Sequence, residues 1–137
     1  MSRRRAREIA LQVLFQVDLV NAEPNRALNY MLDENSVPDK LAAFTRSLVK
    51  GTLEHQLEID ECIKQYAIEW DLTRMANVDR NILRLALYEM LYKVTPRNVA
   101  INEALELAKT FSHDEAPRFI NGVLGMVAKQ NKEIPRQ

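Results

Sequence analysis

The chain has 137 residues, of which 47% are hydrophobic and 28% are charged, a balance typical of a soluble globular protein and not of a disordered one. Its single cysteine excludes an internal disulfide framework and a cysteine-based zinc site, and its 3 glycines and 5 prolines argue against a many-stranded sandwich or barrel. The 19 basic and 19 acidic residues cancel, which excludes a domain that binds nucleic acid through an overall positive charge.

The predicted elements are all helices, because apolar residues recur at three- and four-residue spacing along nearly the whole chain. In chain order the predicted helices cover residues 3–20, 24–34, 38–67, 78–93, 99–111 and 115–130. The 78–93 helix is apolar on nearly every side, so it is expected to lie among several neighbours. The sequence therefore predicts an all-α fold of six or seven helices, in two packed three-helix subdomains covering about 1–70 and 71–137.

Two further features concern location and charge. No apolar run approaches the roughly 18 residues of a membrane span, and no apolar signal segment follows the basic amino terminus, so a cytoplasmic protein with no membrane contact is expected. The charge is segregated along the chain: the first 20 residues carry a net +2, residues 21–71 carry −5 and residues 72–98 carry +3.

The sequence holds no pattern typical of a catalytic site. It lacks a glycine-rich phosphate loop, and its two histidines, His55 and His113, are too distant in sequence to suggest a metal site. The acidic residues Glu58, Asp60 and Glu61 are spread around a helix, and a solvated face is expected for them. We therefore expect no enzyme activity, no cofactor and no metal.

The strongest functional signal is the arginine cluster at the start of the first helix, Arg3, Arg4, Arg5 and Arg7. Four guanidinium groups there repel one another and oppose the positive end of the helix dipole. A phosphate backbone would remove this penalty, since guanidinium groups match phosphate geometry. A basic terminus that only improves solubility fits the pattern equally well.

A second signal lies at the start of the last predicted helix. Arg118 and Asn121 are three residues apart and share a face, and Glu115 precedes them. Phe119 fits a core position, as aromatic residues at helical spacing usually do, but it could also stack on an unpaired base if exposed. Gly122 inside this helix suggests a close backbone crossing.

A third signal is the segment Val78-Asp79-Arg80 at the start of the 78–93 helix. An acid in the first turn of a helix usually interacts with the helix dipole, and this interpretation is favoured for Asp79. The functional alternative is a charged contact with a protein partner.

Taken together, these places resemble the NusB family of bacterial transcription antitermination factors. The resemblance covers nearly the whole chain and is carried by four stretches in the family's order, residues 3–16, 77–89, 99–109 and 119–124. It implies an all-helical fold of two small bundles and a non-enzymatic role. Such proteins bind the boxA element of nascent RNA together with NusE, a ribosomal small-subunit protein. The pair helps RNA polymerase resist termination, notably on ribosomal RNA operons.

The resemblance also implies roles for particular residues. Those that match the family's arginine-rich RNA-binding terminus are Arg3, Arg4, Arg5 and Arg7. Those that fall in its second RNA-contacting region are Glu115, Arg118, Phe119 and Asn121. Those that match the region meeting NusE are Val78, Asp79 and Arg80, with Asp79 expected to pair with a basic residue of the partner.

Two rival interpretations are open. The same helical fold serves as the RNA-binding domain of some ribosomal RNA cytosine methyltransferases, although no methyltransferase segment follows Gln137 in this sequence. A purely structural helical adaptor, with a solubilising arginine cluster, is the other. The family resemblance also leaves both a monomer and a homodimer open.

Overall fold

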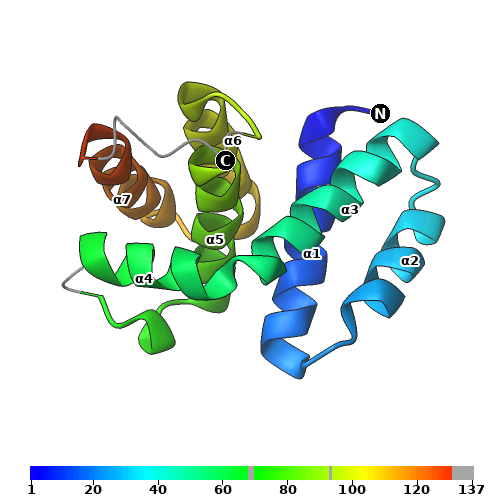
Figure 1. Cartoon of the computed structure of the whole chain (residues 1–137), viewed down its shortest axis with the longest axis horizontal. Helices are drawn as coiled ribbons and strands as arrows, with labels where there is room; N and C mark the ends of the chain where they lie inside the picture. Colours follow the sequence, from blue (N-terminus) through cyan, green and yellow to red (C-terminus); the bar gives the residue numbers. More distant parts are fainter. Residues whose placement is uncertain (68–69, 93, 131–137) are drawn as a thin grey trace. The chain divides into compact units, whose positions relative to one another are not determined.

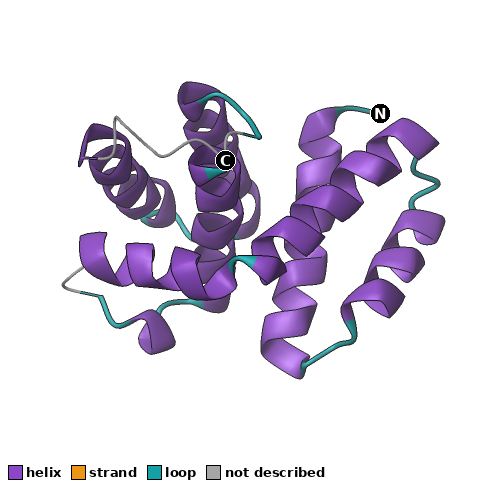
Figure 2. Ribbon diagram, viewed as in Figure 1, coloured by secondary structure: helices purple, strands orange, loops and turns teal. Residues whose placement is uncertain are grey.

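The computed structural model describes residues 1–67, 70–92 and 94–130. Within these ranges the chain forms seven α-helices and one short 3₁₀ helix, and no strand (Figure 2), which confirms the predicted all-α fold. The helices fall into two compact units, Met1–Glu54 and His55–Gln137. None of the helices in the described ranges is long and apolar enough to cross a membrane.

The first unit contains α1 (Arg3–Val20), α2 (Pro24–Glu34) and α3 (Asp39–Glu54). Both α2 and α3 pack against α1, as Figure 1 shows. The ends of α1 and α2 match the predicted ranges for physical reasons. Asn21 ends α1 in the left-handed conformation, and Pro24 starts α2 behind Glu23, whose carboxylate accepts hydrogen bonds from the first backbone N–H groups. The largest buried side chains of this unit are Ile9, Leu14, Leu28 and Leu48.

The second unit contains α4 (Gln56–Tyr66), the 3₁₀ helix η1 (Leu72–Arg74), α5 (Asn77–Leu91), α6 (Arg97–Phe111) and α7 (Ala116–Gln130). Helix α5 packs against α4, α6 and α7 (Figure 1) and buries residues on nearly every side. This placement confirms the central position predicted from its apolar sequence.

The predicted single helix over residues 38–67 is wrong, because the chain breaks at His55 into α3 and α4. The His55 ring stacks on Tyr92 with 4.0 Å between ring centroids, and its Nδ1 lies 3.2 Å from the Glu58 carboxylate. The tertiary contact with Tyr92, together with the local contact with Glu58, favours the break over the continuous helical pattern. Because α4 then packs on α5 and α7, the division between the units falls at residues 54 and 55, and not near residue 70.

A buried ion pair joins α4 to α5. Arg84 Nε and Nη2 donate hydrogen bonds of 2.8 and 2.9 Å to the two carboxylate oxygens of Asp60. The two side chains are 7% and 16% exposed. The prediction that Asp60 belongs to a solvated face is therefore wrong, whereas Glu58 and Glu61 are exposed as expected.

Glu58 and Tyr92 form an exposed hydrogen bond between α4 and the end of α5, with 2.8 Å between the Tyr92 hydroxyl and Glu58 Oε1. This bond, with a further contribution from His55, lowers the pKa of Glu58 below its ordinary value. Partial burial, followed by the bond to Glu58, raises the pKa of Tyr92 to about 12. The stability that Tyr92 contributes is therefore present below pH 10 and is lost as the pH rises through its folded pKa of about 12.

We expect Tyr92→Phe to raise the pKa of Glu58 toward its ordinary value, because the variant removes the hydroxyl donor that favours the ionised carboxylate. A carboxyl group whose pKa is lowered in the folded state stabilises the protein at pH values above its unfolded-state pKa. This stability is lost as the pH falls through the folded-state pKa. The variant should therefore lose less stability on acidification than the parent does. A carboxyl NMR titration measures the pKa, and Tyr30→Phe, at an exposed position on α2, serves as control. An unchanged Glu58 pKa in the Tyr92 variant would contradict the assignment.

Candidate nucleic-acid interface

The arginine cluster lies on the first two turns of α1. Ser2 caps this helix, and its hydroxyl oxygen accepts a hydrogen bond of 3.2 Å from the Arg5 N–H. Arg3 and Arg4 are exposed, Arg5 is half-buried, and Arg7 is only 4% exposed. The fold therefore does not present the four guanidinium groups to solvent as one set.

Two of these arginines lie over the same aromatic ring. The Cζ atom of Arg3 is 4.3 Å from the centroid of Phe44 on α3, and that of Arg7 is 5.3 Å away. A guanidinium group over an aromatic face is attracted by the negative face of the ring. Arg7 therefore contributes to the packing of α1 on α3, a role that the sequence pattern did not indicate.

Arg5 is held by two polar neighbours within the same unit. Its Nη1 donates to Glu8 Oε1 at 3.0 Å, and its Nη2 donates to Asn35 Oδ1 at 2.7 Å. Any phosphate that binds Arg5 must compete with these acceptors. Arg3 and Arg4 are the two members of the cluster that are exposed to solvent.

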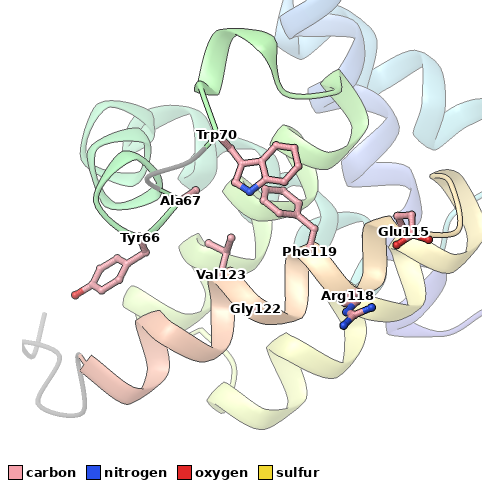
Figure 3. Close-up of a pocket in the computed structure, with 8 residues that line it drawn as sticks. All are labelled: Tyr66, Ala67, Trp70, Glu115, Arg118, Phe119, Gly122 and Val123. Atoms are coloured by element: carbon pink, nitrogen blue, oxygen red, sulfur yellow. The ribbon is translucent and has the colours of Figure 1, made fainter.

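A pocket of about 730 Å³ lies in the second unit, between α7 and the end of α4. Figure 3 shows its aromatic centre, where the Trp70 and Phe119 rings lie 4.9 Å apart between centroids at an angle of 57°. Trp70 is 56% exposed, and Phe119 is half-buried. The lining residues are Tyr66, Ala67, Trp70, Glu115, Arg118, Phe119, Gly122 and Val123.

The pocket combines apolar rings with polar groups at one end. Glu115 and Arg118 lie near the amino end of α7 (Figure 3), and both side chains are exposed. Exposed aromatic faces can stack on an unpaired base, a guanidinium group can bind a phosphate or a base edge, and a carboxylate can accept hydrogen bonds from base amino groups. The arrangement is therefore suited to single-stranded nucleic acid.

Gly122 forms part of the pocket wall. The predicted close backbone crossing at this residue is wrong, since a Cβ atom built there would meet nothing within 4 Å. Gly122 is instead exposed, and the absence of a side chain leaves this part of the wall open.

The segment Val78-Asp79-Arg80 lies in the first turn of α5. The Asp79 side chain is 6% exposed, and one of its oxygens accepts a hydrogen bond of 2.6 Å from the Ser112 hydroxyl. Arg80 Nη1 donates to the backbone oxygen of Leu72 at 3.0 Å. The polar groups of Asp79 and Arg80 thus have intramolecular partners, and Val78 is half-buried.

The NusB family model matches residues 4–129 of the chain, which include the arginine cluster except for Arg3, the pocket, and the segment at the start of α5. The chain belongs to the NusB family. The family resemblance inferred from the four sequence stretches is therefore confirmed.

Individual NusB proteins are similar to this chain along almost the whole of its length. "Transcription antitermination protein NusB" of Desulforamulus reducens is 52% identical over 134 residues, which cover 97% of this chain and 94% of that protein. The structure of T. maritima NusB superposes with a TM-score of 0.89 at 35% identity, covering 98% of this chain and 94% of that one. A chain in a crystal structure of the antitermination factors NusB and NusE in complex with dsRNA superposes with a TM-score of 0.85 at 27% identity, covering 95% of this chain and 99% of that one.

Within this NusB fold, the structure brings three of the four residues predicted for the second RNA-contacting region to one pocket. Glu115, Arg118 and Phe119 line it, whereas Asn121 is exposed on the same helix but outside the lining. Sequence reasoning missed Trp70, which lies between the predicted helices over residues 38–67 and 78–93. A large aromatic residue in a polar connecting segment is the signal that could have found it.

Proposed function

We propose that this protein is a transcription antitermination factor that binds boxA-type single-stranded RNA together with the ribosomal protein NusE and so promotes ribosomal RNA transcription. The observation that carries the proposal is the contact between the exposed Trp70 ring and the half-buried Phe119 ring, in a pocket that Arg118 also lines, in a chain of the NusB family. Named relatives of this chain are transcription antitermination proteins, and one similar structure contains NusE and double-stranded RNA.

The pocket supports binding of an unpaired base. Bases in a duplex are stacked on one another and their major-groove edges are inaccessible in A-form RNA, whereas a single strand can splay a base onto an aromatic side chain. Trp70 offers an exposed ring for such stacking, and Arg118 lies at the same pocket to bind the adjoining phosphate. RNA contact by Glu115 and Asn121 belongs to the same proposal.

The amino end of α1 supplies phosphate contacts in this proposal. Arg3 and Arg4 carry them, with Arg5 contributing when RNA competes with Glu8. Arg7 is assigned to the packing on Phe44 instead, because its side chain is buried.

NusE is the proposed protein partner, and residues 78–80 are the segment predicted to meet it. A neutral chain with few arginine contacts binds RNA modestly by itself, so a second protein that adds contact area raises the affinity through thermodynamic coupling. In the cytoplasm the pair would act in the antitermination complex of RNA polymerase. A homodimer is the alternative assembly, and molar masses measured with and without NusE distinguish the two.

The test is a titration of a labelled boxA oligonucleotide with this protein alone and with NusE present. We expect tighter binding with NusE, and weaker binding to a duplex of the same sequence. A protein that binds neither RNA, with or without NusE, would leave only the structural-adaptor interpretation.

We expect the double variant Arg3→Ala, Arg4→Ala to weaken binding of boxA RNA and to flatten its salt dependence. Each phosphate contact with single-stranded nucleic acid contributes about 0.7 to the slope of log affinity against log salt concentration, so two lost contacts reduce the slope by roughly 1.4. Lys40→Ala, Lys50→Ala removes the same charge from exposed positions in the same unit and should leave the slope nearly unchanged. Equal slopes for the two double variants would count against the arginine contacts.

A further inference from the structure

The buried carboxylate of Asp79 connects α5 to the turn between α6 and α7. Its Oδ1 accepts the 2.6 Å hydrogen bond from Ser112, and its Oδ2 lies 3.6 Å from Nε2 of His113. Asp79 is 4% exposed, whereas the His113 side chain is 62% exposed. Ser112 is therefore the neighbour in this turn that satisfies the carboxylate inside the fold.

The Ser112 contact continues directly to the start of α7. Ser112 is the C-cap residue of α6, where its N–H donates to the Ala108 carbonyl. The backbone oxygen of the next residue, His113, accepts a hydrogen bond of 3.0 Å from the N–H of Ala116. Ala116 is the first residue of α7. The first turn of α7 then carries Arg118 and Phe119 into the pocket.

Because Asp79 is buried, its hydrogen bond to Ser112 is not easily replaced by a contact with another group. A buried carboxylate without a hydrogen-bond donor is strongly unfavourable, so the Asp79 side chain keeps the Ser112 hydroxyl beside it. Its place in the first turn of α5 also favours the negative charge through the helix dipole. If Asp79 turned outward to pair with a partner's cation, it would lose the Ser112 bond.

We propose that Asp79 is a positioning residue for RNA binding: through Ser112 it fixes the α6–α7 turn and thereby the Arg118–Phe119 end of the pocket. The inference rests on the proposed RNA-binding function. It assigns Asp79 to the interior of this protein, in contrast to the predicted ion pair with NusE.

The experiment uses the full chain and the variants Asp79→Ala, Ser112→Ala and the double variant. The first readout is affinity for a single-stranded boxA oligonucleotide. The second needs no RNA, because the chain has one tryptophan, and Trp70 lies 4.9 Å from Phe119 on α7. Its emission maximum and acrylamide quenching therefore report a displacement of α7, while far-UV circular dichroism checks that the variants are folded.

We expect Ser112→Ala to weaken RNA binding by about threefold to tenfold, a part of the effect that the loss of a hydrogen bond to a charged group can have. Trp70 should become more accessible to acrylamide in the same variant. The double variant should be no weaker than Asp79→Ala alone, because both substitutions remove one contact. Asp39→Ala, an acid in the first turn of α3, and Ser47→Ala, a hydroxyl bonded within α3, are the matched controls and should change neither readout.

Three outcomes decide the matter. A folded Ser112→Ala protein with unchanged Trp70 quenching and RNA affinity overturns the proposal. Loss of NusE affinity in Asp79→Ala, with both other readouts unchanged, also overturns it and supports the predicted partner contact. If the parent protein binds no RNA, the proposed function fails, but the Trp70 measurement still decides whether Asp79 positions α7.

Discussion

Replacing Asp60 with alanine should lower the free energy of unfolding by about 3 kcal/mol, the largest effect on stability that we expect from a single polar substitution. The variant removes two charge-assisted hydrogen bonds from Arg84, whose side chain is 7% exposed. Breaking one side of a buried pair costs more than the pair contributes, because the remaining charge keeps its desolvation penalty. For a chain of this length the melting temperature should fall by roughly 10 °C.

A matched control lies one residue away on the same helix. Glu61 pairs with Lys64 at 3.6 Å, but the two side chains are 77% and 59% exposed. Glu61→Ala should therefore change stability by less than about 1 kcal/mol. The double variant Asp60→Ala, Arg84→Met should recover much of the loss, since it removes the buried charge as well. Chemical denaturation measures all three, and similar losses for Asp60→Ala and Glu61→Ala would show that burial of the pair is unimportant.

Replacing Trp70 with alanine should weaken binding of boxA RNA by about tenfold or more, the largest effect on binding that we expect from one residue. Stacking of a base on an aromatic side chain contributes roughly 1–3 kcal/mol by alanine substitution. Because Trp70 is 56% exposed, its removal should reduce the stability of the fold far less than it reduces the affinity for RNA. Fluorescence anisotropy of a labelled oligonucleotide measures the affinity.

The comparison variant is Tyr30→Ala, which removes an aromatic ring that is 62% exposed on α2 and outside the pocket. Its RNA affinity should remain near that of the parent protein. Trp70→Phe should retain part of the affinity, because a smaller ring still stacks. If Trp70→Ala and Tyr30→Ala bind RNA equally well, the pocket is not the site of base contact.

The helices of this protein could be predicted where local signals and packing agree. Helix α1 follows its apolar period from the Ser2 cap to Asn21, and the apolar sequence of α5 indicated its central place. The break at His55 could not be predicted, because it depends on an aromatic contact with Tyr92, far along the chain. Local propensity favoured a continuous helix there, and tertiary packing determined the outcome.

The candidate site was predictable in residue type but not in arrangement. The arginine-rich start and the Phe119 region both stood out in the sequence. Only the folded structure shows that Arg7 is buried on Phe44, that Asp79 is bonded to Ser112, and that Trp70 lies beside Phe119. Each of these depends on contacts between residues distant in sequence, which a one-dimensional period does not encode.

Helix α7 carries glycines at two exposed positions, Gly122 in the pocket wall and Gly125 one turn later. Each glycine lowers intrinsic helix stability by about 1 kcal/mol relative to alanine, so the order of α7 depends heavily on the packing of its opposite face. A molecule that covers the glycine face would restrict the helix as well as contact it. Part of its binding free energy would then be offset by the conformational entropy that α7 loses.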